Sequence, residues 1–234
     1  GIGCLLVGGL FSLTPLQAEL PSALYVFVEV GITFVIYGLL VLGLDLQYGH
    51  TGLVNFGHVV FFAVGAYATA MVAAQDTFSG IGLGYPWPLA LLLGVVAAAL
   101  LGVVVSATSI RLRDDFLAVV TLATAEIFHS IFVNFEGIFG GNVGILGVPR
   151  PIAGLVGDAD TRVVATLLVL GGITLVTLAA VTRLTDAPYG RVLRAIRADE
   201  LVTRSVGKST ITYKTQAFVY GAALAGLAGG LFAL

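Results

Sequence analysis

The chain has 234 residues, of which 58% are hydrophobic and 10% are charged, and its mean hydropathy is +1.05. A soluble domain carries about 25% charged residues, so this composition excludes an ordinary globular protein of the aqueous phase and predicts one embedded in a bilayer. The formal net charge of -2 provides no basic field and excludes nucleic acid as a partner. Cys4 is the single cysteine, which excludes an internal disulfide and a cysteine metal cluster.

Both ends of the chain are apolar. Residues 1–13 lack the basic leading region and the clear cleavage site of a signal peptide, so we interpret them as the remnant of an earlier helix. The other end, Leu234, lies inside an apolar run that a complete spanning helix would continue. We therefore expect residues 1–234 to form a single transmembrane domain that is truncated at both ends.

Six apolar stretches are candidates for membrane-spanning helices. They cover residues 24–44, 53–75, 87–108, 116–135, 163–182 and 216–234. Their length and uniform apolarity exclude the alternating strands of a membrane barrel. The sequence predicts an all-α, polytopic helical membrane protein with about six transmembrane helices and, in the last long loop, a cytoplasmic coupling helix.

The basic residues predict the orientation. Nine of the eleven Lys and Arg residues fall in loops 45–52, 109–115 and 183–215, provided that these loops share one side of the membrane. Because cytoplasmic loops retain Lys and Arg, we expect that side to face the cytoplasm. The glycine-rich connection 136–162 then lies outside, where we expect a structured cap or a re-entrant turn.

The cytoplasmic segment 185–210 predicts a short amphipathic helix that starts at a proline and ends at a glycine. Such a helix suits either docking to a soluble protein or binding to anionic lipid headgroups. Two adjacent acidic residues favour a protein surface, because they gain nothing from anionic lipid. The residues concerned are Pro188, Arg191, Arg194, Arg197, Asp199, Glu200 and Gly207.

The same segment contains Gly207-Lys208-Ser209, which resembles the end of a phosphate-binding loop. The full pattern requires a glycine at position 202, where this chain has Val202. We therefore expect any ATP chemistry to come from another chain and expect this chain not to be an enzyme.

Two polar groups of residues interrupt the apolar stretches. Residues 49–67 bring Asn55 and His58 into the membrane, where helix packing is favoured over direct substrate contact for any single residue. In 116–135, Glu126, Ser130 and Asn134 recur every four residues with His129 alongside, so the four share about 140° of helix surface. The carboxylate of Glu126 near the middle of this span indicates either an ion pathway or pairing with a neighbouring helix. No metal site is predicted, because His50 and His58 lack further ligands.

Three blocks, residues 42–67, 110–127 and 188–200, closely resemble in that order the membrane permeases of branched-chain amino acid ABC importers, of the LivM type. The resemblance extends from about residue 38 to Leu234 and includes 140–145 and 213–218. Urea-type permeases share the same blocks. The resemblance implies a second permease subunit, two cytoplasmic ATP-binding subunits, an extracytoplasmic solute-binding protein and a multi-pass location in the plasma membrane.

The resulting hypothesis is a permease subunit, without a cofactor, that forms part of the pathway for branched-chain amino acids. A permease for urea or short-chain amides, an ion-coupled secondary transporter with Glu126 as its proton site, and a structural membrane scaffold are the alternatives. The candidates to line or gate the pathway are Asn55, His58, Thr121, Glu126 and Asn142. The candidates for ATPase coupling are Arg191, Arg194, Arg197, Asp199, Glu200 and Gly207.

Overall fold

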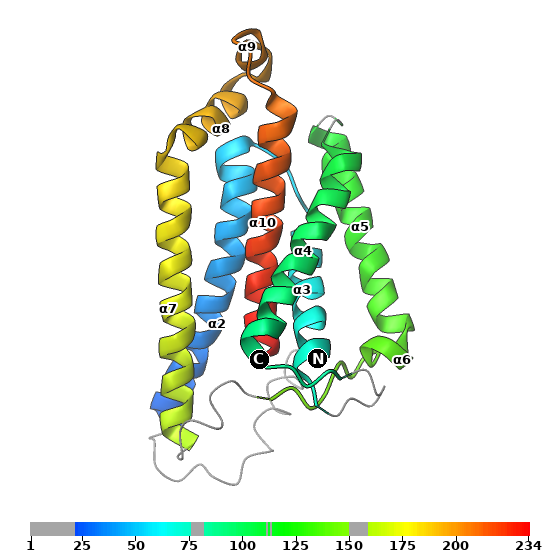
Figure 1. Ribbon diagram of the computed structural model, residues 1–234, viewed down its shortest axis with the longest axis vertical. Helices are drawn as coiled ribbons and strands as arrows, with labels where there is room; N and C mark the ends of the chain where they lie inside the picture. Colours follow the sequence, from blue (N-terminus) through cyan, green and yellow to red (C-terminus); the bar gives the residue numbers. More distant parts are fainter. Residues whose placement is uncertain (1–21, 76–81, 111, 113, 150–158) are drawn as a thin grey trace.

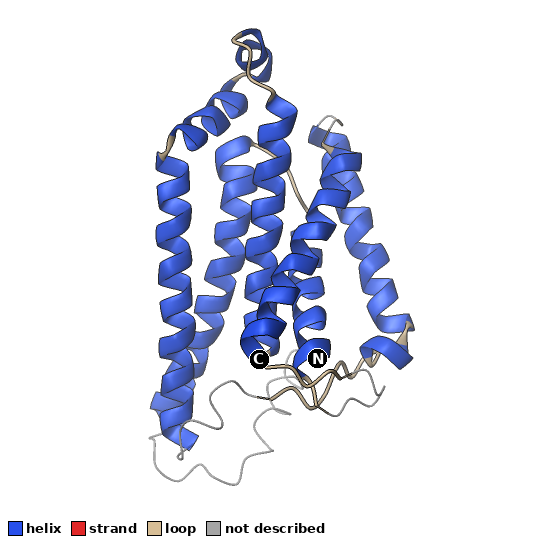
Figure 2. Cartoon of the chain, in the orientation of Figure 1, coloured by secondary structure: helices blue, strands red, loops and turns tan. Residues whose placement is uncertain are grey.

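The structure is a computed structural model and describes residues 22–75, 82–110, 112, 114–149 and 159–234. Within these residues every regular element is a helix (Figure 2). The long helices form a bundle that follows the long axis of the molecule (Figure 1). The all-α expectation is confirmed, whereas the expected leading segment 1–13 lies outside the described residues.

The helices follow the predicted apolar stretches with shifted ends. Residues 22–139 contain α2 (Ser22–Leu44), the π-helix η1 (Asp45–Gly49), α3 (His58–Ala73), α4 (Trp87–Ser109), α5 (Asp114–Asn134) and the short α6 (Glu136–Phe139). Residues 159–234 contain α7 (Ala159–Asp186), α8 (Pro188–Ala198), α9 (Glu200–Ser205) and α10 (Thr210–Ala233).

One of the six predicted spans is wrong in length. Among the described residues, five helices are long and apolar enough to cross a membrane, whereas α3 has only 16 residues. A complete span needs about 20. The predicted stretch 53–75 fails because the chain turns at Gly52, where φ is +75°, and becomes helical only after Gly57. A hydropathy profile reports apolar side chains and does not detect this turn.

The connections divide between the two ends of the bundle. The end of α2 with η1, the α4–α5 connection, and α8 with α9 lie together at one end, which we call the α8 end (Figure 1). The short α6 and the start of α7 lie at the other, the α6 end (Figure 1). The three basic loops therefore share one end of the bundle, which is the condition for the predicted orientation, although Arg111 and Arg113 lie outside the described residues.

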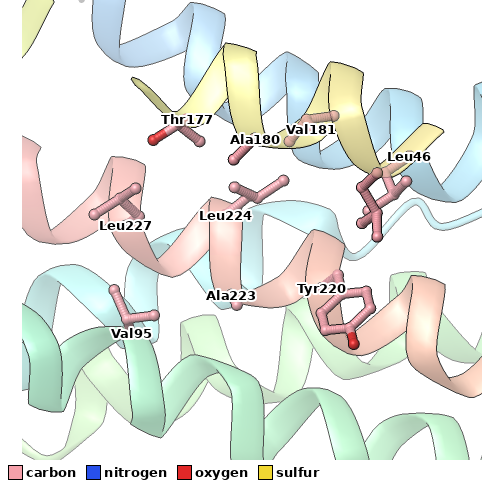
Figure 3. Close-up of a pocket in the computed structure, with 10 residues that line it drawn as sticks. Leu46, Val95, Thr177, Ala180, Val181, Tyr220, Ala223, Leu224 and Leu227 are labelled. Atoms are coloured by element: carbon pink, nitrogen blue, oxygen red, sulfur yellow. The ribbon is translucent and has the colours of Figure 1, made fainter. Parts of the chain in front are cut away.

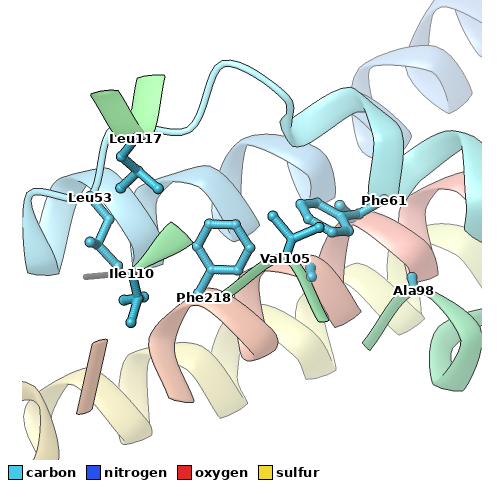
Figure 4. Close-up of a cluster of buried hydrophobic side chains, with 9 residues drawn as sticks. Leu53, Phe61, Ala98, Val105, Ile110, Leu117 and Phe218 are labelled. Atoms are coloured by element: carbon cyan, nitrogen blue, oxygen red, sulfur yellow. The ribbon is translucent and has the colours of Figure 1, made fainter. Parts of the chain in front are cut away.

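The central helix is α10, which packs against α2, α3 and α4. Small residues permit this contact: a Cβ atom on Gly229 would overlap the backbone carbonyl of Phe62 in α3. Close backbone approach of this kind stabilises membrane helices, which gain little from hydrophobic burial against one another. The rings of Phe61 in α3 and Phe218 in α10 meet edge to face, with centroids 5.6 Å apart, within a buried apolar cluster (Figure 4).

Two helices lie at the edges of the bundle. At one edge α7 packs on α2, and at the other α5 packs on α3 and α4 (Figure 1). The ring of Phe132 in α5 stacks on Tyr67 of α3 with centroids 4.3 Å apart. Each edge helix therefore has one side packed against the bundle and one long side that the described residues leave uncovered.

Candidate functional site

The connection between η1 and α3 passes through the bundle interior. We call residues 52–57 the crossover. Its first four residues have no regular secondary structure. Leu53, Asn55 and Gly57 are buried, whereas Phe56 is exposed. Irregular backbone at membrane depth requires hydrogen-bond partners from protein or water. The surrounding polar side chains provide several of them.

Gln47, on η1, is the centre of this polar arrangement and is completely buried. Its Nε2 donates to the carbonyl oxygen of Phe218 in α10 at 2.8 Å, and its Oε1 accepts from Asn55 Nδ2 at 2.8 Å. The Oδ1 atom of Asn55 in turn accepts from the backbone N–H of Gly57 at 3.0 Å. Gln47 and Asn55 therefore join η1, the crossover and α10.

Thr121 holds the same crossover from the side of α5. Its Oγ1 accepts from the backbone N–H of Phe56 at 3.1 Å and donates to the carbonyl oxygen of Ala118 at 3.0 Å. The backbones also touch, because a Cβ atom on Gly57 would overlap the carbonyl of Thr121. The structure thus brings two of the predicted pathway residues, Asn55 and Thr121, to one short segment.

His58 is the first residue of α3 and is also buried. Its Nε2 lies 3.1 Å from the carbonyl oxygen of Leu40 in α2. Because a carbonyl can only accept, Nε2 is the donor in this contact. Nδ1 is buried without a hydrogen-bond partner in the described part of the chain. His58 ties α3 to α2, which is the packing role favoured for it by sequence.

The other two predicted pathway residues lie elsewhere. Glu126 is exposed on α5, as are His129, Ser130 and Asn134, so the polar stripe of α5 faces away from its own bundle. Asn142 is exposed at the α6 end, in a turn in which Gly140, Gly141 and Gly144 all have positive φ. The five candidates therefore separate into a buried group of three and two exposed positions.

A cavity of about 250 Å³ lies between α7 and α10 (Figure 3). Its lining is almost entirely apolar and contains none of the predicted pathway residues. A zwitterionic ligand needs polar groups at defined positions, which this lining does not provide. The residues that line the cavity are Leu46, Val95, Thr177, Ala180, Val181, Leu184, Tyr220, Ala223, Leu224 and Leu227.

The amphipathic helix of the coupling segment is α8, which begins at Pro188 as predicted. Leu193 and Ile196 are buried against the bundle, whereas Arg191 and Arg194 are exposed. Arg197 is also exposed but is engaged with η1. Its guanidinium donates a hydrogen bond to the carbonyl of Gly49 and lies 6.0 Å from the ring centre of Tyr48.

The structure corrects the single predicted helix between Pro188 and Gly207. The chain leaves helical geometry at Asp199, where φ is -158°, and a second helix, α9, follows. The side chain of Asp199 causes this restart, because Oδ1 accepts from the N–H of Val202 at 3.0 Å as an N-cap. Gly207, with φ of +82°, follows α9 and makes the turn toward α10.

Glu200 clamps α9 onto α10. Its Oε2 lies 2.6 Å from Lys214 Nζ, and its Oε1 accepts from Thr210 Oγ1 at 2.8 Å. Partial burial by itself raises the pKa of Glu200, but the hydrogen bonds from Lys214 and Thr210 and the positive charges of Lys214 and Arg204 outweigh it. The pKa of Glu200 therefore lies below its ordinary value.

Sequence reasoning missed Gln47, which holds the crossover, and Lys214, which pairs with Glu200. Gln47 has a local signal, since it is an amide at the end of an apolar stretch and eight positions before Asn55. Lys214 carries no comparable signal, because its pairing with Glu200 depends on the turn between α9 and α10.

The fold and the intramembrane polar groups define a multi-pass helical membrane protein, and a family comparison gives its class. A family model for the permease component of branched-chain amino acid transport systems matches residues 26–234, and the chain belongs to this family. No solved structure matches it.

Curated relatives agree with this assignment. The chain is 35% identical over 227 residues to the high-affinity branched-chain amino acid transport system permease protein LivM of Escherichia coli K12. The aligned region covers 88% of this chain and 52% of LivM. The chain is 27% identical to a probable LivM of Methanocaldococcus jannaschii, with 86% and 65% covered. It is 28% identical to E. coli LivH, with 83% and 65% covered. The chain thus spans about half the length of E. coli LivM.

Proposed function

We propose that this chain is a permease subunit of an ABC importer for branched-chain amino acids in the plasma membrane, with its α8 end in the cytoplasm. Membership of the permease family supports the class, and the names of LivM and LivH support the substrate. The concentration of Arg and Lys at the α8 end supports the orientation. ATP is hydrolysed by a separate subunit in this proposal.

The observation that carries the proposal is the surface of α8 and α9. Beyond α8, at the extreme of the α8 end (Figure 1), lies α9 with Val206, which we call the α9 tip. It exposes Leu201, Val202 and Val206, with exposed fractions of 76%, 59% and 73%. Exposed apolar side chains rimmed by charge are typical of a protein contact. The clamp between Glu200 and Lys214 holds this tip in place. The tip suits docking into a groove of one of the two cytoplasmic ATP-binding subunits.

The translocation path is assigned to the uncovered side of α5. A carboxylate in the bilayer is costly unless it faces water or another protein, and Glu126 is exposed on the side of α5 that its own bundle leaves uncovered. We assign this side to the interface with the second permease, so that the path runs between the two subunits. Thr121 on α5, His58 on α3 and Asn55 in the crossover make hydrogen bonds inside the bundle and hold these helices, whereas Glu126 lines the path.

The chemistry of this side fits a small zwitterion. Glu126 provides a negative charge for the ammonium group, and Ser130 and Asn134 provide neutral hydrogen-bond partners farther along the helix. Asn142 lies at the α6 end, which in this orientation faces outward and would receive solute from an extracytoplasmic binding protein. Ion-coupled transport would use the same carboxylate as a proton site, so the experiment must distinguish the two.

Co-purification and uptake together test the proposal. The tagged chain is expressed in its host, and the double variant Arg191→Glu, Arg194→Glu is compared with Arg183→Glu, which reverses an exposed charge on α7 at the same end. The double variant is expected to lose the co-purifying ATPase and the uptake of labelled leucine, while Arg183→Glu retains both. Leucine uptake that persists without any ATPase would overturn the proposal, as would unchanged ATPase recovery in the double variant.

A further inference from the structure

A chain of contacts leads from the coupling helix α8 to α5. We propose that Gln47 and Asn55 are positioning residues in this chain, which transmits a displacement of α8 through the crossover to the side of α5 that carries Glu126. This inference rests on the proposed function, because it assigns to the ATPase the force that moves α8. The contacts themselves come from the structure.

The first link joins α8 to η1. Arg197 donates to the backbone carbonyl of Gly49 and lies above the ring of Tyr48. Gly49 is the last residue of η1, and the crossover begins three residues later, at Gly52. A Cβ atom on Gly52 would lie only 3.3 Å from Cγ of Arg197, so the arginine also passes close to the start of the crossover. Movement of α8 therefore acts on this backbone directly.

The second link is the buried amide pair. Gln47 is bonded to α10 through Phe218 and to the crossover through Asn55, each at 2.8 Å. Its backbone carbonyl also accepts from Leu53 N–H at 3.1 Å. Because α10 is the central helix, the bond to Phe218 fixes one end of Gln47 while the bonds to Asn55 and Leu53 follow the crossover. Gln47 is thus placed as a pivot between a fixed helix and a movable segment.

The third link joins the crossover to α5. The Phe56 N–H donates to Thr121 Oγ1 at 3.1 Å, and Gly57 is in backbone contact with the same residue. Leu53 and Leu117 belong to one buried apolar cluster, which adds a packing contact between the crossover and α5 (Figure 4). Thr121 and Glu126 are five positions apart on one rigid helix, so a shift at Thr121 moves Glu126 as well.

The distribution of contacts around α5 favours this route. Apart from its contacts with α6, α5 packs on α3 and α4, and the crossover runs directly into α3. Residues with two discrete arrangements carry coupling between distant sites, and hydrogen-bonded networks are one form of such coupling. Closely packed glycines hold the α3–α10 contact, whereas the first four residues of the crossover are not helical and the crossover is held by hydrogen bonds from η1 and α5 and by the contact of Gly57 with Thr121. The crossover is therefore the element through which η1 and α5 are joined.

Spin-label distances in the complete complex test the route. Labels are attached at Leu122→Cys on α5 and Gln216→Cys on α10, both exposed positions, in a Cys4→Ser background. The complex is purified with its ATPase through a tag on this chain and measured with and without a non-hydrolysable ATP analogue. The nucleotide is expected to change the distance between the two labels.

Two variants each remove one link while nearly preserving volume: Gln47→Met and Thr121→Val. Each is expected to abolish the nucleotide-dependent distance change without loss of the bound ATPase, and to lower substrate transported per ATP by about two- to thirtyfold. Thr108→Val on α4 is the matched control, because Thr108 bonds only within its own helix in the described structure. It is expected to retain the change.

The outcomes separate the inference from the proposed function. If α5 moves in Gln47→Met and Thr121→Val as it does in the parent protein, or if α5 of the parent does not move while nucleotide is bound, the route is overturned and the permease assignment stands. If no ATPase is bound by the parent protein, both are overturned. Should Gln47→Met fail to fold, Thr121→Val alone decides, since it removes only one hydroxyl.

Discussion

Lys214 Nζ lies 2.6 Å from Glu200 Oε2, which joins the α9 tip to the first turns of α10. The lysine side chain is 12% exposed and the glutamate 36%, so water screens the pair only in part. Thr210 adds a hydrogen bond to the other carboxylate oxygen. Three groups therefore fix a tip that the proposed function places against a motor subunit.

A double-mutant cycle on Glu200→Gln and Lys214→Met should reveal this interaction. We expect a coupling free energy of about 0.2–1 kcal/mol, the range for partly exposed ion pairs. The measurement is the thermal unfolding midpoint of the purified protein in detergent at neutral pH. Lys208→Met, at an exposed lysine of the same end, should show no coupling to Glu200→Gln. Equal coupling for both lysines would contradict a specific pair.

The same pair should depend on pH. The pKa of Glu200 is lowered in the folded state by Lys214 and Thr210, whose effects exceed the opposing effect of burial. Its contribution to stability is therefore present above the ordinary carboxyl pKa and is lost as pH falls through the lowered value. The difference in unfolding midpoint between the parent protein and Glu200→Gln should shrink over that acidic range. A difference that stays constant with pH would mean that the carboxylate charge contributes nothing.

Close packing of α3 on α10 should be sensitive to a single methyl group. A Cβ atom on Gly65 would overlap the backbone of Gly226, so Gly65→Ala is expected to destabilise the protein by about 1–3 kcal/mol. Gly171 on α7 has no atom within 4 Å of the corresponding position, so Gly171→Ala is the control. Removing a helical glycine there should stabilise by about 0.5–1 kcal/mol. Thermal unfolding of both variants tests the contrast.

Glu126→Gln should reduce transport without affecting assembly. Because Glu126 is exposed, its replacement leaves the core intact, so membrane levels and ATPase recovery should be unchanged. Loss of a hydrogen bond to a charged group, about 1.5–3 kcal/mol, predicts a decrease in leucine uptake of about tenfold or more. Ile127→Leu, at the exposed position beside it, should transport normally. Uptake by the parent protein alone under a proton gradient would instead indicate an ion-coupled transporter.

Much of the architecture could be predicted because it depends on composition and local pattern. Apolar stretches about 20 residues long can satisfy their backbone in lipid only as helices, so the five long spans are predictable. The amphipathic pattern likewise predicted α8 and its start at Pro188. The break at Asp199 was not predicted, because one side-chain cap competes with continuation of the helix and hydropathy does not register that competition.

The roles of single polar residues depended on the tertiary structure. Asn55, His58 and Thr121 are polar residues in apolar stretches, just as Glu126 is, and the four-residue repeat of Glu126, Ser130 and Asn134 does not show which side of α5 packs on the bundle. The structure separates them, because the crossover brings the first three into hydrogen bonds inside the bundle while Glu126 faces outward. Sequence alone determined that these groups lie within a helical membrane domain. Only the packing of α3, α5 and α10 decided which of them are already paired, because hydrogen bonds between distant segments depend on distances that local sequence does not specify.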